Sequence, residues 1–161
     1  MSDVEKRYIL IMKRFGLVMC ALLVSVTLWA QSDAYKEFGK RYDRKGYEVS
    51  TVGRTAIRMA ALAGDKESRE IMRKFDLLVS IKREGGEDEV LHEDFERLVD
   101  GYECVGDYSA ESSRAWLYMN SARTGFAMYM TTPEEQSVLL LSGKELNLDD
   151  LLPPQMQEIT N

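Results

Sequence analysis

The stretch Ser113-Arg-Ala-Trp-Leu-Tyr-Met-Asn-Ser121 decides the fold class, because its side chains alternate with the two-residue period of a β-strand. The alternation divides the apolar residues into an aliphatic face and an aromatic face: Ala115, Leu117 and Met119 on one side, Trp116 and Tyr118 on the other. The stretch is therefore predicted to be a strand that packs on at least one of its faces.

Three neighbouring segments have the same character, so the second half of the chain is predicted to be rich in strands. They are Tyr102 to Tyr108, Gly125 to Thr131 and Gln136 to Ser142. The glycine in Arg123-Thr-Gly125 supplies a turn between two of them. Consecutive strands joined by short connections predict an antiparallel meander.

The segments before the meander mix helices and strands. Helical spacing of Tyr35, Phe38 and Tyr42 predicts a short first helix, and the clearest helix runs from Glu87 to Tyr102. Its apolar stripe is Val90, Leu91, Phe95, Leu98, Val99 and Tyr102. Between these helices we expect a strand at Tyr47 to Thr51, a helix after Gly53, a helical turn capped by Asp65 and a buried strand at Phe75 to Lys82.

These elements predict an α+β fold with one domain. We expect an antiparallel or mixed sheet with a C-terminal strand meander and helices packed on one face, after an N-terminal signal helix. The predicted organisation is a signal peptide at residues 1–30, the domain at residues 31–152 and a flexible tail at residues 153–161, where Pro153-Pro154 ends a last short helix.

The N-terminal segment follows the three-part pattern of a secretory signal peptide. Met12-Lys-Arg14 is a basic region, and Phe15 to Trp29 is an uncharged and mostly apolar run of 15 residues. A membrane-spanning helix needs about 20 apolar residues, so no permanent span is expected in the mature form. Two points stay open: translation starts at Met1 or Met12, and cleavage follows Ala30, which we prefer, or Ala34.

A lipid anchor is the weaker alternative for this segment. Cys20 is preceded by Met19, where a lipoprotein signal requires a small residue, and the apolar stretch between Arg14 and Cys20 is short. After cleavage Cys104 is the remaining cysteine, so an intramolecular disulfide is excluded in the mature chain.

The charge balance argues against nucleic acid as a partner. The net charge of the whole chain is −6, and removal of residues 1–30 takes away four basic and two acidic residues, which leaves −8. A chain with this charge repels a phosphate backbone unless it carries a local basic patch.

From Tyr35 to Leu152 the chain resembles a family of short exported proteins of Bacteroidetes-type bacteria, the domain of unknown function 4252 family. The matching features follow a signal ending in Ala30-Gln31 and are the aromatic helix and turn from Tyr35 to Gly46, the strand entry Lys74 to Leu78, and the strand exit Leu140 to Lys144 before Leu148 to Leu151. The resemblance implies export and a bacterial envelope setting, and it implies no catalytic residue.

No catalytic, cofactor-binding or metal-binding residue is predicted. His92 is the single histidine and has no second nitrogen or sulfur ligand at zinc spacing, so an exposed helix position is favoured. Cys104 lies in a predicted strand and is expected to be a small core residue. Acidic residues are numerous enough that a carboxylate pair for hydrolysis remains an alternative.

The residues singled out for a ligand or partner face are Trp116, Tyr118 and Tyr129. Aromatic and methionine residues concentrate in two adjacent strands, where packing beneath a helix is favoured over an exposed binding face. The expected function is that of an exported cell-envelope protein acting as a non-enzymatic binding or accessory module, with an envelope protein as a possible partner. The alternatives are an extracytoplasmic hydrolase and a structural or signalling component of an envelope complex.

Overall fold

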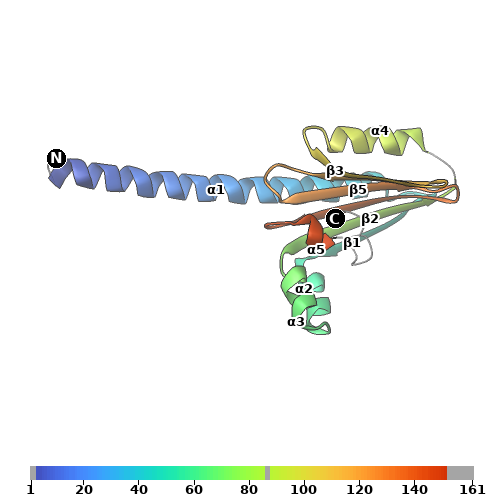
Figure 1. Cartoon of the computed structure of the whole chain (residues 1–161), viewed down its shortest axis with the longest axis horizontal. Helices are drawn as coiled ribbons and strands as arrows, with labels where there is room; N and C mark the ends of the chain where they lie inside the picture. Colours follow the sequence, from blue (N-terminus) through green and yellow to red (C-terminus); the bar gives the residue numbers. More distant parts are fainter. Residues whose placement is uncertain (1–2, 86–87, 152–161) are drawn as a thin grey trace.

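The computed structural model describes residues 3–85 and 88–151, and for residues 20–29 it describes the backbone alone. A long N-terminal helix projects from an α+β domain built on one sheet (Figure 1). The elements in chain order are α1 (Asp3–Arg41), β1 (Glu48–Gly53), α2 (Arg54–Leu62), α3 (Lys66–Met72), β2 (Phe75–Glu84), α4 (Glu89–Leu98), β3 (Glu103–Ala110), β4 (Ser113–Met119), β5 (Gly125–Thr131), β6 (Glu135–Gly143) and α5 (Leu148–Leu151).

The sheet has six strands in the order β1-β2-β6-β5-β4-β3, and every neighbouring pair is antiparallel. The predicted α+β class and the meander from β3 to β6 are confirmed. The last strand returns to the middle of the sheet, because β6 pairs with β2 and so joins the early part of the chain to the meander. The predicted tail at residues 153–161 lies outside the described residues.

The predicted signal segment and the predicted aromatic helix form one continuous helix, α1. No proline interrupts residues 3–41, and Ala30 to Ala34 contain no strong helix breaker. Side chains 3–19 are all exposed, whereas Tyr35, Phe38 and Tyr42 are buried in the core. At Gly39 a Cβ atom would come within 2.9 Å of Val79, so glycine lets α1 lie close on β2. None of the described helices combines the length and hydropathy that a membrane span requires.

Helices lie on both faces of the sheet, which corrects the expectation that they pack on one. The C-terminal part of α1 and helix α4 cover the first face, where Tyr35, Phe38, Leu91 and Phe95 pack on inward residues of β2, β5 and β6. On the second face, residues of α2, α3 and α5 line a small apolar groove of about 340 Å³ together with residues of β1, β2 and β6. The physical reason is that β6 is apolar on both sides: Val138 and Leu140 point to the first face, Leu139 and Leu141 to the second.

Candidate functional site

The three aromatic residues predicted from the sequence lie together on the first face of the sheet. Trp116 and Tyr118 come from β4 and Tyr129 from β5, and the register pairs Trp116 with Tyr129. Tyr129 is fully buried, while Trp116 and Tyr118 are half-buried. Ala115, Leu117 and Met119 point to the other face, as the alternation predicts.

Helix α4 covers this aromatic cluster. The His92 ring stacks on Tyr129 at 4.7 Å and on Trp116 at 5.6 Å between ring centroids. Phe95, one turn later, lies 5.5 Å from Tyr129 and 5.8 Å from Tyr118. Of the two predicted alternatives, Tyr129 therefore packs beneath a helix, and it cannot form part of an open ligand face. The ligand role stays a prediction for the exposed parts of Trp116 and Tyr118.

His92 has a more specific place than an exposed helix position. Its side chain is 30% exposed, and its Nε2 atom lies 3.5 Å from the Glu96 carboxylate one turn along the helix. A ring stacked on two aromatic rings fixes the helix on the sheet at this point. The periodicity of α4 gave no sign of it, because His92 lies beside the apolar stripe and not in it. Val90, which was predicted for the stripe, is 56% exposed.

Two tyrosine–aspartate pairs hold α4 against the rest of the domain. The Tyr47 hydroxyl donates to Asp88, the N-cap residue of α4, and the Tyr42 hydroxyl donates to Asp94 in its second turn. Burial raises the pKa of Tyr42, and the hydrogen bond and negative charge of Asp94 raise it further. Asp88 also accepts from the Val90 amide at 3.1 Å and pairs with Arg83 at 3.1 Å.

Burial of Asp88 favours its neutral form, but the Tyr47 hydroxyl, the Arg83 charge and the helix amides outweigh it, so the net pKa of Asp88 is lowered. A lowered pKa in the folded state adds stability above the ordinary value of 3.8, and this stability is lost as the pH falls through the lowered pKa.

Asp88→Asn is therefore expected to reduce the free energy of unfolding at neutral pH, and the deficit relative to the parent should shrink below about pH 4. Urea unfolding at several pH values measures it. Glu89→Gln is the matched control, because Glu89 is exposed and forms no ion pair with any described residue. A deficit that stays constant from neutral pH to pH 3 would contradict the assigned role of the Asp88 charge.

Cys104 is exposed on the edge strand β3, which corrects the expectation of a core position. An edge strand has neighbours on one side only, and the register shifts between Cys104 and Gly106, so the thiol is not covered. Among the described residues, no three His, Cys, Asp or Glu side chains come together in a group that could hold a metal ion. Three acidic residues share a surface hollow with Arg97: Glu93 and Glu96 lie on α4, and Asp100 lies in the turn that follows it. No other described residue lines this hollow, so no second carboxylate group faces these three across it.

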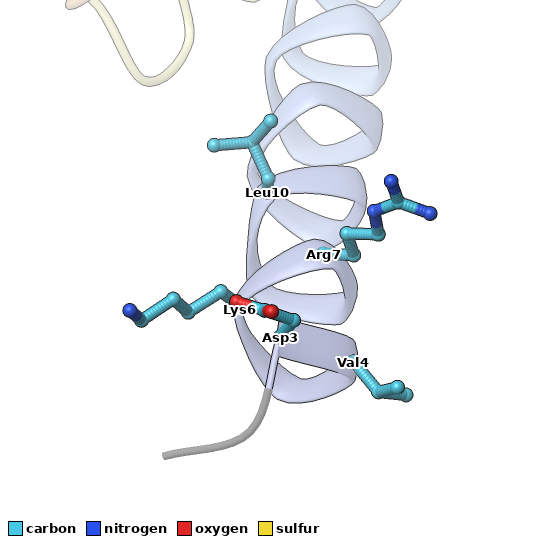
Figure 2. Close-up of a pocket in the computed structure, with 5 residues that line it drawn as sticks. All are labelled: Asp3, Val4, Lys6, Arg7 and Leu10. Atoms are coloured by element: carbon cyan, nitrogen blue, oxygen red, sulfur yellow. The ribbon is translucent and has the colours of Figure 1, made fainter.

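A shallow hollow at the start of α1 has no convergent chemistry. Figure 2 shows Asp3, Val4, Lys6, Arg7 and Leu10 along the first turns of α1, where Lys6 and Leu10 extend to one side of the helix and Val4 and Arg7 to the other. All five are exposed. They belong to the segment predicted to be removed on export.

The residues that directly follow the predicted cleavage site contact the domain. Ala30 is exposed, whereas Gln31 and Ser32 are partly buried. The Gln31 side-chain amide donates to the Tyr102 hydroxyl, and the Ser32 and Ser142 hydroxyls are 2.6 Å apart. The Tyr35 hydroxyl continues this contact, 2.9 Å from that of Tyr102. Gln31 and Ser32, the two residues that directly follow Ala30, thus both contact the domain.

A group of arginines that the sequence analysis missed lies between α2 and α3. The two helices border a hollow of about 640 Å³ whose lining includes Arg54, Arg58, Arg69 and Arg73. Each pair is spaced by four residues, which places its members on one helix face, and the turn at Gly64 and Asp65 brings the two faces together. The four-residue spacing of the arginines is visible in the sequence. The contact between the two helices, which joins the four arginines in one group, is not.

Comparison of the chain with protein-family models, with curated proteins and with solved structures found no match. The resemblance to the domain of unknown function 4252 family therefore stays a prediction from the sequence.

Proposed function

We propose that the chain is an exported cell-envelope protein whose mature domain, beginning at Gln31, is a non-enzymatic binding or accessory module. The observation that carries the proposal is the contrast between the start of α1 and its C-terminal part. Side chains 3–19 are exposed and contribute nothing to the core, while Gln31, Ser32 and Tyr35 are hydrogen-bonded to the domain. A signal peptide is absent from the mature protein, so a segment with this role is expected to leave the core intact when it is removed.

The binding part of the proposal rests on which polar side chains hold the domain together and which lie on its surface. His92 stacks on the sheet, and two tyrosine–aspartate pairs join α4 to the segment between α1 and β1, so these polar side chains hold α4 in place. The arginines between α2 and α3 are instead presented on the surface. This favours recognition by a surface over catalysis in a pocket.

Cell fractionation of the native host tests the proposal. The protein is expected in the periplasmic or envelope fraction, resistant to added protease in intact cells and digested after the envelope is opened. Purified protein is expected to show no turnover in a panel of hydrolase substrates. Recovery in the cytoplasmic fraction would contradict the export, and turnover that is lost in His92→Ala or Cys104→Ser would contradict the non-enzymatic role.

A further inference from the structure

The surface formed by α2 and α3 combines positive charge with exposed apolar side chains. Arg54, Arg58, Arg69 and Arg73 line the hollow between the helices together with Met59 and Leu62. Among the described residues that line it, none is acidic. We call this set the α2–α3 surface.

Two of the four guanidinium groups have no ion-pair or hydrogen-bond partner among the described residues. Arg54 pairs with Asp76 at 2.6 Å, and the Arg69 side chain donates to the Asp65 carbonyl oxygen at 3.3 Å. Arg58 and Arg73 are exposed, and neither forms an ion pair with any residue that the structure describes. The chain as a whole is negatively charged, with a net charge of −6, whereas this surface concentrates positive charge. A surface of this kind favours an anionic partner.

The apolar side chains beside these arginines are unusually exposed. Met59 is 67% and Leu62 is 75% exposed, and outside α1 the other large apolar side chain found so exposed among the described residues is Val90. Burying either would be favourable, whereas a small soluble anion would leave both in water. Arginine beside exposed Met and Leu on a short amphipathic helix is the composition of a surface that rests in a lipid headgroup layer.

The position of the α2–α3 surface fits the same partner. Ser32 of α1 contacts Ser142 near the end of β6, and the next residue, Gly143, packs against the backbone of Lys74, which follows Arg73. Figure 1 shows α2 and α3 toward the end of the sheet from which α1 projects. While the apolar run of the precursor is still attached and at a membrane, this end of the domain is the one held closest to that membrane.

We propose that the α2–α3 surface docks on an anionic phospholipid membrane, with Arg58 and Arg73 contacting headgroup phosphates and Met59 and Leu62 entering the interface. The envelope supplies such a surface, so the physiological setting rests on the proposed function. The binding itself does not depend on it.

Co-sedimentation with vesicles tests the docking. The protein is purified from the cells that produce it. Its mass is measured, and only preparations with the same N-terminus are compared. It is expected to bind vesicles containing phosphatidylglycerol, to bind pure phosphatidylcholine vesicles much more weakly, and to be released by salt. Arg58→Gln with Arg73→Gln is expected to weaken binding roughly tenfold or more. Met59→Ser with Leu62→Ser is expected to weaken it as well.

The matched control is Lys36→Gln with Lys40→Gln, which removes the same number of positive charges from exposed positions on α1. It is expected to bind nearly as the parent does. Equal losses in the arginine and lysine variants, equal binding to both kinds of vesicle, or complete competition by inorganic phosphate or a soluble acidic polypeptide would each overturn the proposal. Fractionation decides the export independently, so the two can fail separately.

Discussion

Phe95→Ala is expected to lower the free energy of unfolding by about 4 kcal/mol, the usual cost of removing a buried phenyl ring. Phe95 is 1% exposed and lies between Tyr118 and Tyr129, so the deletion leaves a cavity in the interface between α4 and the sheet. His92 stacks on the same Tyr129 ring, and the loss of Phe95 therefore also loosens its support. Urea or thermal unfolding, followed by circular dichroism, measures the change.

Val90→Ala is the matched control on the same helix. Val90 is 56% exposed, so this substitution is expected to change the free energy of unfolding by less than about 0.5 kcal/mol. Equal effects at Phe95 and Val90 would show that α4 does not cover the aromatic cluster as described. Retention of full stability in Phe95→Ala would show the same.

Local patterns were sufficient for the elements that depend on neighbours in sequence. The alternation at Ala115 to Met119 predicted both faces of β4, and Asp65 was predicted as a cap and accepts from the Ser68 amide at 2.8 Å. The pairing of β6 with β2 was not accessible in this way, because it joins segments about 60 residues apart in sequence. Because β6 lies in the middle of the sheet and is apolar on both faces, both faces must be buried. Helices therefore pack on each of them.

The same long-range pairing explains the errors at single residues. Cys104 is exposed because β3 is an edge, which no local pattern reveals. Val90 lies in the first turn of α4 and is exposed to solvent, although its spacing matches the stripe. The arginine groups of α2 and α3 needed the contact between these helices to become one surface. Tyr129 and Trp116 were predicted together because adjacent hairpin strands bring them together by local pairing.

Export is expected to remove the first 30 residues. The 15-residue apolar run fits a signal peptide and falls short of a bilayer span, and Lys13-Arg14 orients it with its amino end inside. Cleavage after Ala30 keeps the contacts of Gln31 with Tyr102 and of Ser32 with Ser142, whereas cleavage after Ala34 removes both and makes the buried Tyr35 the first residue. The structure thus gives a reason to prefer Ala30 that the small-residue pattern alone did not.

Intact-mass measurement of protein from the native host is expected to find a species that begins at Gln31. Its side chain either remains an amide, as the Tyr102 contact favours, or cyclises to pyroglutamate with loss of one ammonia. Ala30→Leu is expected to abolish this species and to leave either the precursor or the product that begins at Tyr35, because the cleaving enzyme requires a small residue at that position. A parent mass that retains Met1 or Met12 would contradict cleavage, and a mass with an acylated Cys20 at the terminus would show a lipoprotein instead. A species that begins at Gln31 would show that the cell cuts α1 directly before the residues that contact Tyr102 and Ser142.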